Sequence, residues 1–339
     1  MNQSNPPQSC SFDSIDINMD IVRMVIYIPT FILGLILNVL AMRVFWSLCR
    51  ENSDHLTTYI CMINLAIFDL QLLVSLLFKM VLAKKPTTNV LCTIAECLYF
   101  VSMYGSVFTI VFISFDRYIR IKYPFWAHHS RTPKMSVMVC CCIWVVVWVG
   151  SIPIYDFHPT GNVKCFHNMS RGSWETTPIV CLELFGFVIP LAVVSYCSFH
   201  SIVILLRDNT ATQKRACIWT IVINFSVFVA SFLPVHLGIF LQFLVKRDVI
   251  QGCMARQAII VFLQLTMCFA NVNCCLDVFC YYFVAKEFIK GAQDQGSSIF
   301  VMSRHLSRRL SASLMTGSRH KCTKGKELAE NEEEEEERG

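Results

Sequence analysis

The sequence predicts an all-α membrane protein, a bundle of seven transmembrane helices followed by a short amphipathic helix and a disordered tail. Composition gives the first reason: 55% of the 339 residues are hydrophobic and 16% are charged, whereas about 25% of the residues in soluble domains are charged. The second reason is that seven apolar stretches have about the length that a helix needs to cross a bilayer. They are residues 21–46, 57–82, 93–115, 136–156, 176–206, 214–245 and 257–283.

An odd number of spans places the two termini on opposite sides of the membrane. Residues 1–20 contain aspartates but no lysine or arginine, whereas the loop after the third span is basic. By the positive-inside rule, we expect residues 1–20 to be extracellular and that loop to be cytoplasmic. Lys84 and Lys85 in an outer loop weaken this charge bias. No cleavable signal peptide is evident, so the first span is expected to direct insertion.

The second and seventh spans each contain a carboxylate, Asp69 and Asp277. Charged residues inside a membrane are costly and point to function by default. Asn38, Ser106 and Asn273 offer further oxygen ligands. Two neighbouring carboxylates cannot both stay ionised without a cation between them, so either a sodium ion binds at Asp69 or one acid is protonated. In the alternative interpretation, hydrogen bonds satisfy each acid separately.

The third span runs from Cys92 to the triplet Asp116-Arg117-Tyr118. The 25 positions between Cys92 and Arg117 correspond to about 37 Å of helix, enough to cross a bilayer of about 30 Å with tilt. One helix would therefore hold a cysteine outside and an acid-arginine pair at the cytoplasmic boundary.

Glu96 follows Cys92 by one helical turn, and Tyr99 continues the same face. Lys79, near the outer end of the second span, is close enough to pair with Glu96. Alternatively, Lys79 extends only to the lipid headgroups. A basic outer surface favours an anionic ligand over an amine. Its further members are Lys84, Lys85, Lys164, Arg171, Lys246, Arg247 and Arg256.

Prolines are expected within several spans, where each removes a backbone hydrogen bond and permits a bend. Bends at Pro190 and Pro234 would provide hinges in the fifth and sixth spans, although static kinks are equally common there. The full set is Pro29, Pro153, Pro178, Pro190 and Pro234.

Most of the 18 cysteines fall in helices or cytoplasmic segments, where they act as small packing residues. Four are predicted outside: Cys10, Cys92, Cys165 and Cys253. An even number in an oxidising compartment suggests two disulfides, with three connectivities open. Two glycosylation acceptors, Asn2 and Asn168, lie on the same predicted side.

The chain changes character after the seventh span. Residues 284–292 have apolar and basic faces typical of a short amphipathic helix on the inner leaflet. Residues 293–339 are a basic stretch followed by an acidic run, which cannot bury a core and is predicted to be disordered. Within it, Ser311 follows two arginines and matches a basophilic kinase site, which would help to recruit arrestin, although a plain solvated linker is about as good an interpretation.

Together these features resemble the rhodopsin-like (class A) G-protein-coupled receptors. The resemblance covers residues 20–292, and residues 21–283 are the predicted receptor domain. The matching positions are Gly34 to Asn38, Leu65 to Asp69, Cys92, Asp116-Arg117-Tyr118, Trp144, Pro190 and Pro234. Two patterns depart from the family. Phe232 stands where most members have tryptophan, and Asp277-Val278 stands where most have Asn-Pro.

Within the family, four segments are similar to receptors for lysophosphatidylinositol and cannabinoid-like ligands: residues 92–108, 165–170, 231–238 and 271–283. This resemblance implies disulfides from Cys92 to Cys165 and from Cys10 to Cys253. It also implies a ligand pocket for an anionic lysophospholipid. The implied pocket residues are Lys79, Glu96, Tyr99, His167, Phe232, His236, Lys246, Gln264 and Met267.

The resemblance implies a plasma-membrane receptor that activates a 12/13-class heterotrimeric G protein, or a q-class one, with Rho and calcium signalling. Asp116, Arg117 and Tyr118 would couple to the G protein. The sixth span begins after Gln213-Lys214-Arg215 and lacks the acid that many relatives use to hold the arginine, so we expect easier basal signalling.

Other classes fit the sequence less well. A retinal protein needs a lysine in the seventh span, and residues 257–283 contain none. A zinc hydrolase needs about three clustered ligands, and His200 and His236 lie on different spans. We therefore expect that the protein is not an enzyme and that it has no nucleic-acid partner and no cofactor. An ion-coupled transporter using Asp69 and Asp277 and a receptor for another lysophospholipid or a nucleotide remain as alternatives.

Overall fold

The computed structural model describes residues 13–51, 56–82, 87–125, 127, 132–152, 162–163, 174–207 and 214–278. The chain divides into two units, residues 1–283 and 284–339, and the second lies wholly outside the described residues. The predicted amphipathic helix at 284–292 and tail at 293–339, including Ser311, therefore stay predictions.

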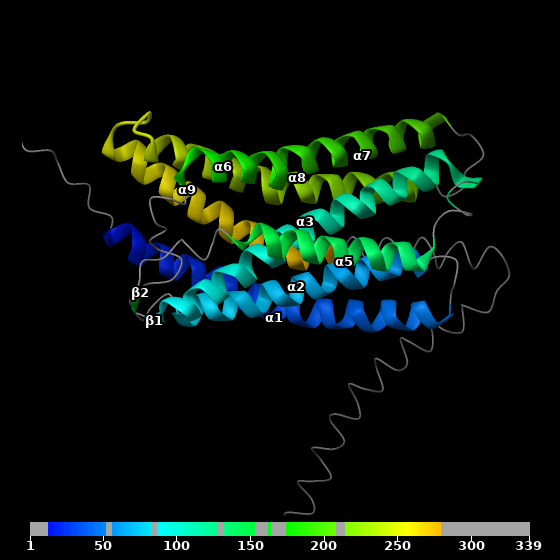
Figure 1. The fold of residues 1–339 in the computed structure, drawn as a ribbon, viewed down its shortest axis with the longest axis horizontal. Coiled ribbons are helices and arrows are strands. Elements are labelled where there is room, and N and C mark those ends of the chain that lie inside the picture. The colour runs from blue at the N-terminus through cyan, green and yellow to red at the C-terminus, as the bar shows by residue number, and fades with distance from the viewer. Residues whose placement is uncertain are drawn as a thin grey trace, which may run out of the picture. The chain divides into compact units, whose positions relative to one another are not determined.

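Seven helices long and apolar enough to span a membrane confirm the predicted bundle (Figure 1). The elements are α1 (Asp13–Glu51), α2 (Leu56–Leu82), α3 (Asn89–Lys122), α5 (Pro133–Gly150), α6 (Thr176–Glu183), α7 (Ile189–Arg207), α8 (Lys214–Lys246) and α9 (Cys253–Asn271). The fifth span contains both α6 and α7, joined by the π-helical segment η3 (Leu184–Val188). A two-stranded antiparallel ladder pairs β1 (Thr87–Thr88) with β2 (Asn162–Val163).

Several helix boundaries differ from the predicted ones. α3 extends past residue 115 to Lys122, so Asp116-Arg117-Tyr118 lies within the helix. α5 begins at Pro133, where the side chain of Thr132 accepts a hydrogen bond from the amide of Met135, and ends at Gly150 rather than 156. A proline at the first helical position suits a helix start because its missing N–H would have no partner there.

The structure argues against the predicted bend at Pro178 and leaves the other proline bends as predictions. Pro178 lies in the first turn of α6, where the backbone N–H groups have no partner within the helix, so it breaks no hydrogen bond there. Pro153 lies outside the described residues. Pro29 and Pro234 lie inside α1 and α8, and Pro190 is the second residue of α7, which follows η3. The π-helical segment close to this proline interrupts the regular α-helix of the fifth span.

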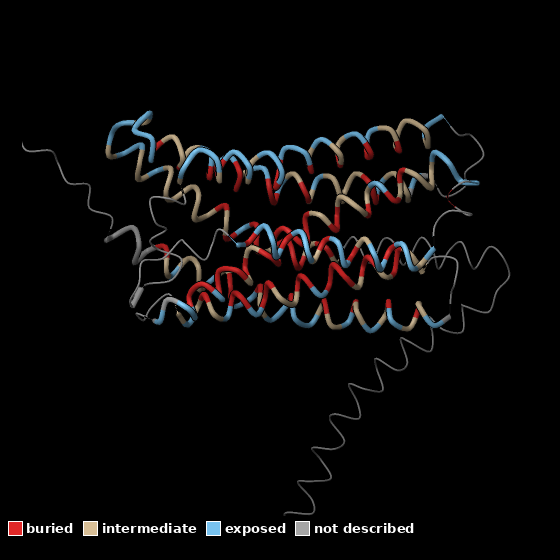
Figure 2. Tube along the Cα trace, in the orientation of Figure 1, coloured by how far each residue is buried: buried red, intermediate tan, exposed pale blue. Residues whose placement is uncertain are grey.

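The bundle has apolar side chains on its outside and polar ones within, as a protein surrounded by lipid requires. Ile32 and Val146 are more than half exposed, whereas Asn38 and Asp69 are almost completely buried. Buried residues are concentrated along α2 and α3 (Figure 2). In the most apolar 18-residue segment of each span, 61% is buried for α2 and for α3, whereas 22% is buried for α5. α3 is therefore central in the bundle and α5 is peripheral.

Close packing between α2, α3 and α5 depends on Gly105. A Cβ atom at this position would lie 2.2 Å from Cε1 of Phe68. Phe68 in turn stacks on Trp144 with ring centres 4.1 Å apart. The Trp144 indole donates to Asn64 Oδ1 at 2.9 Å, and Asn64 Nδ2 donates to Thr109 at 2.9 Å. A chain of hydrogen bonds thus joins the three helices, and lipid tails offer no hydrogen-bonding groups that could replace it.

Candidate ligand-binding and signal-transfer sites

Lys79 lies at the end of α2 that adjoins the start of α3, and it is buried. Its Nζ lies 4.3 Å from the ring centre of Tyr99 and 5.9 Å from that of Tyr27. Both tyrosine rings are almost fully buried. The alternative in which Lys79 reaches only headgroups is wrong, because its ammonium faces aromatic rings inside the bundle. An ammonium over aromatic faces is stabilised there and still attracts an anion.

Glu96 and Cys92 lie on the same face of α3, one helical turn apart. Glu96 is fully buried, and its Oε1 lies 3.8 Å from Cys92 Sγ. Glu96 is also among the charged groups close enough to act electrostatically on Lys79. The predicted trio of Lys79, Glu96 and Tyr99 is therefore brought together.

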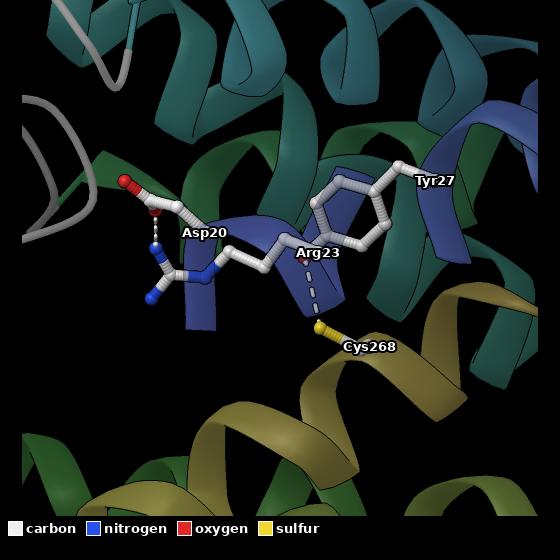
Figure 3. Close-up of polar contacts among 4 residues, drawn as sticks. All are labelled: Asp20, Arg23, Tyr27 and Cys268. Carbon is white, nitrogen blue, oxygen red and sulfur yellow. Dashed lines mark hydrogen bonds and ion pairs between the residues drawn. The ribbon is translucent and has the colours of Figure 1, made fainter. Parts of the chain in front are cut away.

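Two further residues of this cluster were not identified from the sequence. Tyr27 of α1 accepts a hydrogen bond from Cys268 of α9, with 3.5 Å between oxygen and sulfur (Figure 3). Both side chains are buried. Because an aromatic residue and a cysteine in apolar spans look like ordinary packing residues, no sequence signal marks them. We call Lys79, Glu96, Tyr99, Tyr27 and Cys268 the outer cluster.

A second polar contact crosses the bundle at His236 of α8. Its Nδ1 lies 3.2 Å from Oε2 of Glu183, the last residue of α6. The imidazole stacks on Phe187 of η3 with ring centres 4.4 Å apart, and Tyr104 approaches it edge-on at 6.1 Å. Glu183 falls within the predicted span 176–206, but nothing in the sequence predicted its partner. The pair links the fifth and sixth spans.

His236 is thus in a more polar setting than a contact for an acyl chain would be. Its Nε2, the second carboxylate oxygen of Glu183 and the Tyr104 hydroxyl are buried without a hydrogen-bond partner among the described residues. Buried polar atoms of this kind are normally matched by water or a ligand. The three atoms therefore mark a part of the bundle that calls for hydrogen-bond partners.

The other predicted ligand residues fall in three settings. Phe232 is buried and packs against Phe228 with ring centres 5.2 Å apart. Met267 belongs to an apolar cluster with Val235 and Ile239. Gln264 is half-buried, Lys246 is exposed at the end of α8, and His167 lies outside the described residues. The structure therefore does not place Lys246 within the outer cluster.

The predicted polar centre is buried in the middle of the bundle. Ser106 donates to Oδ1 of Asp69 at 3.3 Å. Separately, Ser231 donates to Asn273 Oδ1 at 3.0 Å, and Asn273 Nδ2 donates to Asp277 Oδ2 at 2.8 Å. Each carboxylate thus accepts at least one hydrogen bond, and both the sodium site and the separately satisfied acids stay predictions.

Asn38 of α1 does not turn its amide nitrogen toward these acids. It donates to the backbone carbonyls of Gly34 and Cys274, at 3.0 and 2.8 Å. Carboxylate and hydroxyl oxygens are the ligands that a hard cation prefers, so Asp69 with Ser106 fits a sodium ion in donor chemistry. Among the described residues, no three His, Cys, Asp or Glu side chains form a metal site.

The acid-arginine triplet lies at the opposite end of α3. Asp116 pairs with Arg120 one turn later, with 3.2 Å between Oδ2 and Nη2. Arg117 faces α8: with the Asn224 amide turned so that its oxygen faces Arg117, that oxygen accepts from Nη1 at 3.2 Å. Tyr118 accepts a hydrogen bond from Lys122 at 2.8 Å and meets Tyr196 of α7 edge-on.

The contact between Arg117 and Asn224 lies at a small cavity between α3, α7 and α8. Arg117 lines a small cavity with Ser114 of α3, three residues of α7 and two of α8. The α7 residues are Cys197, Ser198 and Ser201, and the α8 residues are Ile221 and Asn224. An amide on α8 thus contacts Arg117.

Cys92 and Cys253 are both disulfide-bonded. Their predicted partners, Cys165 and Cys10, lie outside the described residues, as do Asn2 and Asn168. The other described cysteines are free thiols.

Comparisons with known proteins agree with this arrangement. Residues 37–281 match the family described as "7 transmembrane receptor (rhodopsin family)". The G-protein coupled receptor 55 of Homo sapiens is 53% identical over 298 residues, covering 85% of this chain and 92% of the relative. That of Mus musculus is 52% identical over 297 residues, with 83% and 90% covered. Lysophosphatidic acid receptor 4 of Homo sapiens is 32% identical over 279 residues, with 78% and 75% covered.

Proposed function

Because the chain belongs to the rhodopsin family of seven-transmembrane receptors, a class of receptors and not of enzymes, we propose that its ligand is an extracellular anionic lysophospholipid. Lysophosphatidylinositol is the lead candidate. Binding activates a 12/13-class heterotrimeric G protein, with the q class as a second route, and leads to Rho and calcium signals. The receptor acts at the plasma membrane with its N-terminus outside and recruits arrestin through its tail.

The observation that carries this proposal is the buried ammonium of Lys79. A lysine enclosed by Tyr27 and Tyr99 would attract a phosphate strongly, because the surrounding low dielectric screens the charge little. The relatives add support, since two receptors among them are named for lysophosphatidic acid. Phosphate on a single acyl chain is the chemistry that the cluster and these names share.

The acyl chain would extend from the outer cluster toward Phe232 and the apolar residues around Met267. Each buried CH₂ contributes about 0.8 kcal/mol, so potency should rise with chain length. His236 and Glu183 would meet a polar part of the ligand instead, because their buried unpartnered atoms require hydrogen bonds.

Ligand binding can shift the receptor only if it is stronger in the active bundle than in the resting one. Movement of α8 about Pro234 would separate Asn224 from Arg117 and widen the cavity between α3, α7 and α8. The freed Arg117 would then be available to a G protein. This route uses a contact that the resting bundle contains and the active one would lose.

The decisive experiment is a panel of lysophospholipids and nucleotides, tested for Rho and calcium responses in cells that express the receptor. We expect responses to lysophospholipids and none to the matching monoacylglycerols, which lack phosphate. Lys79→Ala serves as the headgroup variant and should weaken every anionic ligand. Unchanged potency in that variant would contradict the headgroup assignment.

Two results would favour the alternatives. A response to nucleotides alone would assign the same phosphate chemistry to a different ligand class. Uptake of labelled lipid into vesicles that contain the protein and no G protein would identify a transporter.

A further inference from the structure

Arg23 of α1 lies beside the outer cluster and was not among the predicted ligand residues. Its Nη1 lies 2.7 Å from Oδ1 of Asp20, three residues earlier on the same helix (Figure 3). The Arg23 side chain is only 14% exposed, whereas that of Asp20 is 39% exposed. A guanidinium this poorly hydrated needs an anionic partner. In the free receptor, Asp20 provides one.

Arg23 and Lys79 border the same tyrosine from two helices. Arg23 precedes Tyr27 by one helical turn and therefore lies on the same face of α1. Lys79 Nζ approaches the Tyr27 ring from α2. Arg23 is also among the charged groups close enough to act electrostatically on Lys79. The contact between α1 and α2 thus brings two cations to the same end of the bundle.

The described residues around Tyr27 include two cations and two acids. Arg23 and Lys79 contribute two positive charges, and Asp20 and Glu96 can contribute two negative ones. An added phosphate must therefore take the place of an acid at one of the cations. Glu96 is fully buried and cannot move into water without opening the bundle. Asp20 is the exposed one and can move away from Arg23 at small cost.

We propose that Arg23 is a second phosphate-binding residue, and that the phosphate of an anionic lysophospholipid replaces Asp20 as its partner. A guanidinium presents paired N–H donors that match two phosphate oxygens, whereas the ammonium of Lys79 acts as a point charge. Arg23 therefore sets the orientation of the bound phosphate, whereas Lys79 attracts the phosphate through its charge. This inference rests on the proposed function, because it assigns a further residue to the same headgroup.

The test compares Arg23→Gln, Asp20→Asn and the double variant in the full-length purified receptor. Affinity is measured as the ligand-dependent rise in thermal stability, with 1-oleoyl lysophosphatidylinositol and the phosphate-free 1-oleoylglycerol as probes. Arg23→Gln should weaken the phospholipid about tenfold, in line with the strength of charge-assisted hydrogen bonds. Asp20→Asn should strengthen it about threefold, because an exposed competing ion pair is weak. The double variant should match Arg23→Gln.

Affinity for 1-oleoylglycerol should not change in any variant. If the ion pair only stabilises the start of α1, both single variants would lower thermal stability alike and leave phospholipid affinity at the wild-type value, which overturns the proposal. If Arg23→Gln does not fold, Arg23→Lys replaces it. Because Arg23→Lys keeps the charge and loses the paired donors, it should still weaken the phospholipid, and an unchanged affinity would contradict the role of Arg23.

The assay separates this inference from the proposed function because it needs no G protein. A receptor that binds the phospholipid more tightly than 1-oleoylglycerol but signals through no lysophospholipid would disprove the proposed function and leave the role of Arg23 testable in the same assay. Equal wild-type affinity for the two probes would disprove the phosphate site itself.

Discussion

At the outer end of the bundle, Lys79 contacts aromatic rings from two other helices, whereas at the inner end Asp116 pairs with Arg120 on its own helix. The outer contacts exist only when α1, α2 and α3 are packed together. The inner pair lies within one helix, although the same triplet also contacts other helices: Arg117 faces Asn224 of α8, and Tyr118 meets Tyr196 of α7. Contacts between helices hold the outer site in shape, whereas the pair of Asp116 and Arg120 does not by itself connect two helices. This difference suits a molecule that binds at one end and responds at the other.

The largest expected effect comes from breaking the cross-helix link between Glu183 and His236. Glu183→Gln removes the charged acceptor from a buried imidazole. This should cost about 2 kcal/mol and lower the melting temperature in detergent by about 4 °C. Glu175→Gln, at the exposed start of α6, is the matched control and should change it little. Equal melting temperatures for both variants would show that the link does not hold the two spans together.

Sodium tests whether the polar centre in the middle of the bundle binds a cation. If a sodium ion binds at Asp69 and Ser106, sodium chloride should raise the melting temperature by about 2 °C over choline chloride at equal ionic strength. Asp69→Asn should abolish the difference, because the carboxylate supplies the charge that holds the ion. A sodium effect that persists in Asp69→Asn would place the ion elsewhere.

The single-helix inner end should respond in basal signalling and not in ligand affinity. Asp116→Asn is expected to raise ligand-free Rho output up to about fivefold, since a partly exposed pair contributes at most about 1 kcal/mol. Arg120→Gln breaks the same pair from its other side. If both variants raise output equally, Asp116 acts through Arg120. If only Asp116→Asn does, it acts on Arg117 directly.

The smallest effect is expected at Lys246. This lysine is exposed at the end of α8, where water and salt screen its charge. Lys246→Met should change the potency of an anionic ligand by less than about twofold. A loss as large as that of Lys79→Ala would show that the ligand contacts α8 at the outer end and that the site is wider than the outer cluster.

Sequence reasoning recovered part of the candidate site. Glu96 and Tyr99 were found because residues three and four apart share a helix face. Asp69 and Asp277 were found because charges are rare in apolar spans. Tyr27 and Cys268 were missed because nothing in the sequence states which faces of α1 and α9 meet. Asn224 was missed because an amide in an apolar helix carries no charge to mark it.

The sequence by itself determined the seven spans and the position of Asp116-Arg117-Tyr118 at the end of the third. The reason is that a bilayer leaves every backbone group to be satisfied within its own helix, so the length of an apolar run is enough to define a span. Only the tertiary structure decided that Lys79 lies between Tyr27 and Tyr99 and that Glu183 reaches His236. Those contacts depend on how each helix is rotated against its neighbours, and packing between helices fixes that rotation.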